Sequence, residues 1–127
     1  MLLVDEINVI SDENGMPVAH GIYHVTGEEF FLKGHFPEHP VVPGVIICEI
    51  MGQTSSILMK EELIGRTPFF ISIDNVRFKR PITPNETMCI KAHIANKRAQ
   101  IYFVEAEVRV ARELCAQGKL TFALVNN

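Results

Sequence analysis

The sequence predicts a single α+β domain in which one long helix packs against an antiparallel sheet. One segment, residues 43–63, has no proline after its first position, and its first half is apolar nearly all round, which is typical of a buried helix. Much of the remaining chain alternates apolar and polar residues with a period of two, as strands with one wet face do. The 127 residues fit one domain, residues 1–127.

The segments before the helix are predicted to form a hairpin and then a stiff loop. Asn14-Gly15 is a strong turn signal between residues 3–11 and 17–26, which are therefore expected to pair as strands. Residues 34–43 hold three prolines and two histidines. Proline restricts the backbone and cannot donate a ladder hydrogen bond, so this segment is expected to be a loop.

Four more strands are predicted after the helix, which is expected to end near Leu63, just before Gly65. In residues 69–80 the apolar parity slips, and this indicates a bulge near Asp74-Asn75. Regular alternation marks the other three strands, at residues 87–94, 104–110 and 114–124. One sheet covers only one side of a helix that is apolar all round, so a second copy of the chain is expected to cover the rest.

Composition excludes several classes of function. The formal net charge of −3 argues against nucleic acid as a partner, since phosphate binding needs an excess of Lys and Arg. The longest apolar run, residues 41–51, is interrupted and far shorter than the ~20 residues of a membrane span. Met1-Leu2-Leu3-Val4-Asp5 lacks the basic start of a signal peptide, so none is expected. Cys48, Cys89 and Cys115 have no disulfide spacing, which indicates a cytoplasmic protein.

Three groups around the start of the helix are candidates for chemistry. Glu49 lies in the apolar run 46–51 with no Lys or Arg one turn away. Desolvation without a cation favours the protonated carboxyl, so Glu49 is a candidate general acid; a Glu at a dimer rim is the alternative. His35, on the proline-pinned loop, is a candidate general base, and His39 is its rival. The N–H of Gly44 could polarise a carbonyl, as in an oxyanion hole.

Gln53 is a fourth candidate site residue. Gln53 lies one turn after Glu49 on the same helix face and could orient it or a bound water; an interface amide is an equal alternative. No metal-ligand pattern, P-loop or dinucleotide motif appears, so no cofactor is expected. A base, an acid and an oxyanion site together suit proton abstraction next to a thioester carbonyl with loss of a hydroxyl.

Residues 34–53, GHFPEHPVVPGVIICEIMGQ, resemble the FabZ family of 3-hydroxyacyl-(acyl-carrier-protein) dehydratases. The shared pattern HFPxxPxxPGxxxxExxxQ is long and fixes several residue types. The likeness also extends to residues 2–5 and to residues 73–81, so that it covers nearly the whole chain. Glu49 favours this family over the related dehydratase/isomerases, which generally carry Asp there.

The resemblance implies a hot-dog fold, in which an antiparallel sheet wraps a long helix, with chains paired as dimers that often assemble as trimers of dimers. It implies a hydro-lyase that converts (3R)-3-hydroxyacyl thioesters to trans-2-enoyl thioesters, with His35 and Glu49 as the catalytic pair from opposite subunits. Gly44 would contact the thioester carbonyl. The substrate would be carried on the phosphopantetheine of acyl carrier protein. That partner is acidic, so basic residues are candidates for its docking: Arg77, Lys79, Arg80, Lys97 and Arg98.

The sequence leaves two alternatives to dehydration. In a hot-dog thioesterase Glu49 would activate water, but the intact loop pattern speaks against hydrolysis, which needs no base at His35. In a non-catalytic paralogue the chain would bind acyl carrier or stabilise a partner dehydratase. Family members usually carry an LPHRxPF segment before the LLVD strand, whereas this sequence starts at Met1-Leu2-Leu3, which favours the second alternative; intact His35 and Glu49 argue against it.

Overall fold

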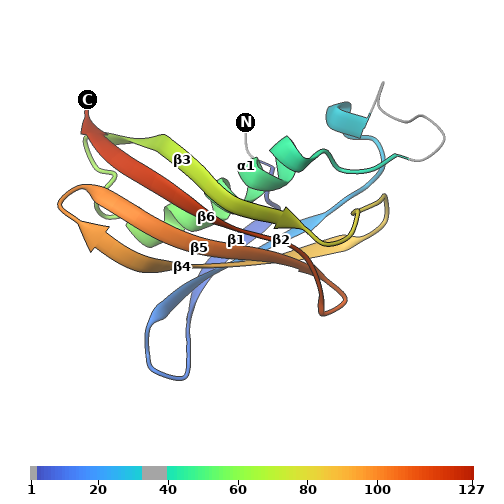
Figure 1. The fold of residues 1–127 in the computed structure, drawn as a ribbon, viewed down its shortest axis with the longest axis horizontal. Coiled ribbons are helices and arrows are strands. Elements are labelled where there is room, and N and C mark those ends of the chain that lie inside the picture. The colour runs from blue at the N-terminus through green and yellow to red at the C-terminus, as the bar shows by residue number, and fades with distance from the viewer. Residues whose placement is uncertain (1–2, 33–39) are drawn as a thin grey trace.

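The computed structural model describes residues 3–32 and 40–127 and has one helix inside one curved, six-stranded antiparallel sheet (Figure 1). The helix α1 spans Gly44–Ser55, and short 3-10 turns lie at Phe30–Leu32 and Ser56–Met59. The strands are β1 Glu6–Ser11, β2 Pro17–His24, β3 Arg66–Phe78, β4 Thr87–Arg98, β5 Ile101–Val110 and β6 Glu113–Asn126. The α+β prediction is confirmed.

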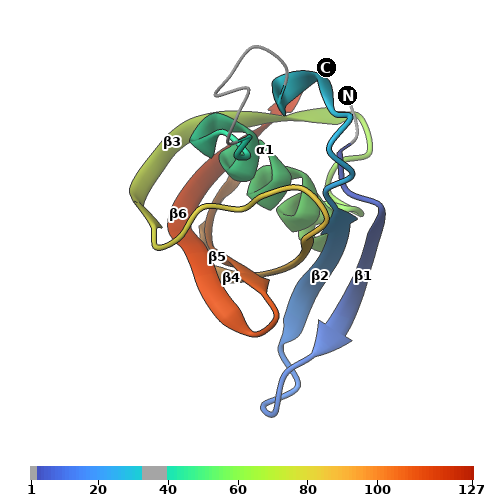
Figure 2. The same cartoon turned by 90° about the vertical axis from the view of Figure 1, so that its right-hand side faces the viewer.

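The sheet order is β1-β2-β4-β5-β6-β3, so β3, the strand that follows the helix, lies at the far edge beside the last strand. All pairs are antiparallel. In Figure 2 the sheet curls around α1, which packs against β2, β4 and β5 on the concave side. We call the concave side the inner face and the opposite side the outer face.

The predicted hairpin is confirmed, and its turn has a clear physical cause. The carboxylate of Asp12 accepts hydrogen bonds from the backbone N–H groups of Asn14 and Met16, at 2.8 and 2.9 Å. Gly15 adopts φ of 79°, a conformation that glycine reaches without steric cost. The turn therefore closes around its own aspartate, as Asx turns do.

The alternating strands and the bulge in β3 are also confirmed. Along β5 every second side chain from Tyr102 to Val110 is buried against the helix side, and β6 repeats the pattern from Ala116 to Leu124. The β3–β6 register shifts between Asp74 and Arg77, at the predicted bulge. A second shift, between Phe70 and Ser72, was not predicted.

The predicted end of the helix near Leu63 is wrong, because α1 ends at Ser55. The hydroxyls of Ser55 and Ser56 donate to the carbonyls of Met51 and Gln53, both at 2.7 Å. Such side-chain bonds compete with the helical ladder for the same carbonyls. The chain tightens into a 3-10 turn and continues as turns up to Gly65, where β3 follows.

In the single chain the sheet covers one side of α1, whereas the sequence predicted a helix buried all round. Ile50 and Met51 are fully buried, while Val45 is 74% exposed. The edge strand β3 likewise exposes large apolar side chains: Phe69, Phe70, Ile71, Ile73 and Phe78. Within residues 3–32 and 40–127, no helix has the length and apolar character needed to cross a bilayer.

Candidate functional site

The start of α1 presents backbone N–H groups that the helix does not use. Pro43 is extended, with φ of −61° and ψ of 147°, and its carbonyl accepts the N–H groups of Ile46 and Ile47 at 3.0 and 3.2 Å. The N–H groups of Gly44 and Val45 therefore lie ahead of the helical ladder. Such groups carry positive partial charge and suit a developing oxyanion.

Close packing against the end of β3 favours glycine at position 44. A Cβ atom on Gly44 would lie 2.9 Å from Cζ of Phe78, shorter than real Cβ contacts. The absence of a side chain thus lets the last residue of β3 pack against the first turn of the helix. It also leaves the Gly44 N–H without a side chain of its own beside it.

The structure brings Glu49 and Gln53 together and fixes the direction of the amide. The Oε1 atom of Gln53 accepts the backbone N–H of Leu3 at 2.7 Å, so its NH₂ group is the donor to Oε1 of Glu49 at 3.3 Å. The start of the chain thereby sets which end of the amide faces the carboxylate. An amide donor holds the orientation of the carboxylate that it binds.

Glu49 is exposed in the single chain, which corrects the expectation that its own fold would desolvate it. Its neighbours on the helix, Cys48 and Ile50, are half-buried and fully buried. The carboxylate therefore lies on the side of α1 that this sheet does not cover. The apolar residues next to Glu49 in the sequence lie on other faces of the helix, so they do not bury Glu49 itself.

His35 and His39 lie outside the described residues, so their predicted roles stay predictions. The described chain on both sides of them is well anchored. Before them, the carboxylate of Glu29 accepts the hydroxyl of Tyr23 at 2.5 Å and the N–H groups of Thr26 and Gly27 at 2.9 and 2.8 Å.

Burial opposes the charge on Glu29, but these hydrogen bonds outweigh it and lower its pKa to about 2. The pKa of Tyr23 is raised by burial and by the hydrogen bond to Glu29. Sequence reasoning missed this pair, since Tyr23 and Glu29 follow no motif. After the histidines, the N–H of Val42 donates to the carbonyl of Ile82 at 2.8 Å and ties the chain to the segment beyond β3.

The five predicted docking cations do not form one patch. Arg77 and Lys79 are exposed at the end of β3, on either side of Phe78, which packs against the start of the helix. Lys97 and Arg98 lie at the β4–β5 turn. Across the sheet, Arg98 pairs with Ile101, Ile101 with Ala123, and Ala123 with Phe69, so this turn lies at the same end of the sheet as the start of β3.

Arg80, also predicted as a docking residue, is half-buried and paired with two carboxylates. Its two Nη atoms bind both carboxylate oxygens of Glu86 at 2.8 and 2.7 Å, and its Nε binds Glu113 at 3.0 Å. The bidentate pair with Arg80 lowers the pKa of Glu86 to about 2.

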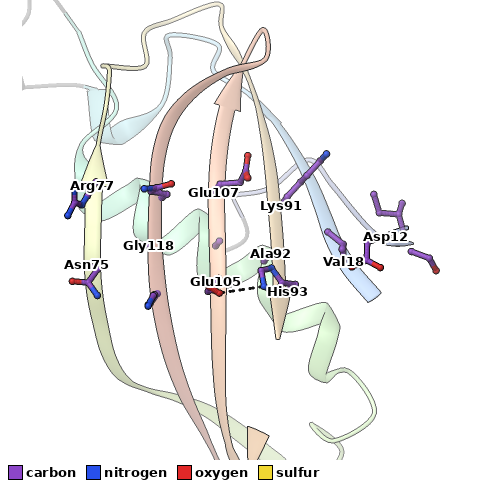
Figure 3. Close-up of a pocket in the computed structure, with 15 residues that line it drawn as sticks. Asp12, Val18, Asn75, Arg77, Lys91, Ala92, His93, Glu105, Glu107 and Gly118 are labelled. Atoms are coloured by element: carbon purple, nitrogen blue, oxygen red, sulfur yellow. Dashed lines mark ion pairs between the residues drawn. The ribbon is translucent and has the colours of Figure 1, made fainter. Parts of the chain in front are cut away.

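A hollow of about 890 Å³ lies on the outer face, between the sheet and the tip of the β1–β2 hairpin (Figure 3). Lys91 and His93 on β4 lie opposite Glu107 and Glu105 on β5. Nε2 of His93 is 3.6 Å from the carboxylate of Glu105. The sheet separates this hollow from the helix start. Among the described residues no three His, Cys, Asp or Glu side chains gather as metal ligands would.

Comparison with known proteins decides the family. The model of the FabA-like domain matches residues 1–119. The chain belongs to the FabA-like family. A protein of Caldicellulosiruptor bescii is 42% identical over 97% of this chain and 87% of its own length. A protein of Lactococcus lactis subsp. cremoris is 40% identical over 97% of this chain and 84% of its own length. Both are named 3-hydroxyacyl-(acyl-carrier-protein) dehydratase FabZ.

Solved structures show that this FabA-like chain has the hot-dog fold. The dehydratase heterocomplex ApeI:P of Xenorhabdus doucetiae superimposes with a TM-score of 0.69 over 93% of this chain and 98% of that chain, at 20% identity. The protein smu.793 of Streptococcus mutans, solved with acetyl CoA, gives a TM-score of 0.72 over 100% and 94%, at 12% identity. The resemblance seen in residues 34–53 is thus confirmed at the level of family and fold.

Proposed function

We propose that this protein is a hydro-lyase that dehydrates (3R)-3-hydroxyacyl thioesters on acyl carrier protein to trans-2-enoyl thioesters in type II fatty acid synthesis. The observation that carries the proposal is about 40% identity over nearly the full length to FabZ dehydratases. The HFPxxPxxPGxxxxExxxQ pattern is intact across that length. The phosphopantetheine arm belongs to the substrate, and no cofactor of the protein is required. Free Cys48, Cys89 and Cys115 suit the reducing cytoplasm.

The proposed chemistry assigns one role to each group. His35 removes the proton on the carbon next to the thioester carbonyl, and the Gly44 N–H stabilises the charge that develops on the carbonyl oxygen. Glu49 donates a proton to the departing hydroxyl, so that water leaves and the carbon–carbon double bond forms. Gln53 is a positioning residue, because its NH₂ group, directed by Leu3, holds the Glu49 carboxylate.

The proposed active form is a homodimer, and three such dimers would form the larger assembly, a trimer of dimers. The edge strand β3 leaves its outer N–H and C=O groups free for a further strand, and Phe69 and Ile71 on it are 63% and 52% exposed. Val45 at the start of α1 is exposed too. A second copy along this edge would cover the open side of the helix and desolvate Glu49, as a general acid requires.

The test of the activity is turnover of a 3-hydroxyacyl thioester, followed by the absorbance of the enoyl product and by release of free thiol. We expect enoyl product without free thiol. His35→Ala and Glu49→Gln should each lower kcat by about 10²-fold or more. His39→Ala, four residues further along the chain, is the matched control and should keep most of the rate. Free thiol without enoyl product would instead indicate a thioesterase, and neither product from folded protein would indicate a binding subunit.

Complementation tests whether the two catalytic residues come from different subunits. Neither His35→Ala nor Glu49→Gln alone should be active, whereas coexpression of the two makes mixed dimers in which one of the two sites is intact. Half of the dimers would be mixed, so about a quarter of the wild-type activity should return. If His35 and Glu49 act within one subunit, no activity returns on mixing.

For the acidic carrier protein, Arg77 and Lys79 are the proposed docking residues because they are exposed on either side of Phe78, which packs against the start of the helix. Arg77→Ala and Lys79→Ala should raise KM for the carrier-linked substrate, with little effect on a small thioester that lacks the carrier. Lys97→Ala and Arg98→Ala, at the other end of the sheet, are the matched controls. Equal effects of all four substitutions would contradict docking at the end of β3.

A further inference from the structure

A thiol and an imidazole lie in contact on the outer face, on the opposite side of the sheet from α1. Nε2 of His20 on β2 is 3.0 Å from Sγ of Cys89 on β4. Both side chains are half-buried, so the sulfur is held in place and still reachable. The two residues are 69 positions apart in the sequence, and only the β2–β4 pairing brings them together.

Charged side chains surround Cys89, and two of them are cations. Arg109 on β5 is its direct cross-strand neighbour and also binds the carboxylate of Glu107. Lys91 follows Cys89 on the same face of β4, opposite His20. Cations beside a reacting sulfur stabilise the negative charge that it develops. The other titratable groups that face this pair come from three strands: Glu6 on β1, His24 on β2 and Glu107 on β5.

The other two thiols have different environments. Cys115 is fully buried, and burial raises the pKa of its thiol. Its Sγ donates to the carbonyl oxygen of Glu113 at 3.4 Å, and a backbone carbonyl is not a base that could remove the thiol proton. Burial also raises the pKa of Cys48 on α1. Desolvated thiols of this kind react slowly with electrophiles.

We propose that Cys89 and His20 form a covalent modification site for soft carbon electrophiles of the α,β-unsaturated carbonyl class. The sulfur forms a bond to the β-carbon, and the π electron pair of the double bond moves to the α-carbon. Nε2 of His20 accepts the thiol proton, and the α-carbon receives a proton in return, so the step is an addition without a leaving group. The dehydration product is itself an α,β-unsaturated thioester, so the protein works among compounds of this class.

The test is labelling of the full-length protein with N-ethylmaleimide, followed by peptide mass spectrometry at each cysteine. At pH 7, Cys89 should react at least about tenfold faster than Cys48 and Cys115. His20→Gln should slow labelling of Cys89 by about tenfold and remove the part of its pH profile that follows imidazole titration. His24→Gln, on the same face of β2, is the matched control and should leave the rate unchanged.

Equal labelling of the three cysteines in the wild type would overturn the proposal, and this comparison needs no variant to fold. An unchanged rate and pH profile in a folded His20→Gln protein would remove His20 from it. The site is independent of dehydration: His35→Ala should lose turnover and keep the labelling rate of Cys89. Failure of one proposal is thus separable from failure of the other.

Discussion

Replacing Thr54 by valine should stabilise the protein. Thr54 lies on α1 facing β2, is fully buried, and its Oγ1 has no hydrogen-bond partner among the described residues. A buried hydroxyl without a partner costs about 1–3 kcal/mol. Valine has nearly the same shape and a similar helix propensity, and its extra methyl adds roughly 0.8 kcal/mol of burial. The larger methyl also lies close to the backbone of Gly21 on β2, where little space is left, which offsets part of the gain.

We therefore expect Thr54→Val to raise the free energy of unfolding by about 1 kcal/mol, which corresponds to a rise in Tm of roughly 3 °C for a domain of this size. The assay is urea unfolding at fixed protein concentration, because association of subunits shifts apparent stability. Thr54→Ser, which keeps the hydroxyl and loses the methyl, is the control and should be destabilised. A loss of 1 kcal/mol or more in Thr54→Val would refute the reasoning, since the hydroxyl would then have a partner worth keeping.

Three further predictions concern the sheet and its ion pairs. Gly21→Ala should destabilise the fold by roughly 1–3 kcal/mol in urea unfolding, because its Cβ would lie 2.6 Å from Oγ1 of Thr54; unchanged stability would contradict this packing. Arg80 lowers the pKa of Glu86 from 4.5 to about 2, so this pair stabilises the fold above pH 4.5 and its contribution is lost as the pH falls towards 2. Glu86→Gln should lower the free energy of unfolding at neutral pH and reduce its fall between pH 6 and pH 3, both measured by urea unfolding. An equal fall in the wild type and in Glu86→Gln would argue against this role of the pair. Phe69→Lys on the edge strand should shift the protein towards monomer in sedimentation experiments, whereas an intact dimer would place the interface elsewhere.

The sequence predicted the features of the fold that depend on local pattern. Asn14-Gly15 marked the hairpin turn, and the parity slip near Asp74 marked the bulge in β3. The end of the helix was missed because Ser55 and Ser56 turn their hydroxyls back onto helix carbonyls, an outcome that periodicity does not report. Local pattern thus predicts where an element exists better than where it stops.

The candidate site was predictable only in part, for a similar reason. The positions of Gly44 and Gln53 on α1 follow from helical spacing and agree with the structure. The exposure of Glu49 does not, since a run of apolar neighbours cannot tell burial in one chain from burial between two. Contacts between distant strands, such as Cys89 with His20, require the strand order, which alternation alone does not give.

The position of β3 at the far edge of the sheet has a consequence for synthesis on the ribosome. Its hydrogen-bonded neighbour within the chain is β6, the last strand to be made. Roughly 50 residues separate the end of β3 from the end of β6, so at ~5–20 residues per second the nascent strand waits for several seconds. Throughout that interval its phenylalanines and isoleucines have no sheet to join. Nascent chains halted before β6 should therefore be among those that bind chaperones most strongly.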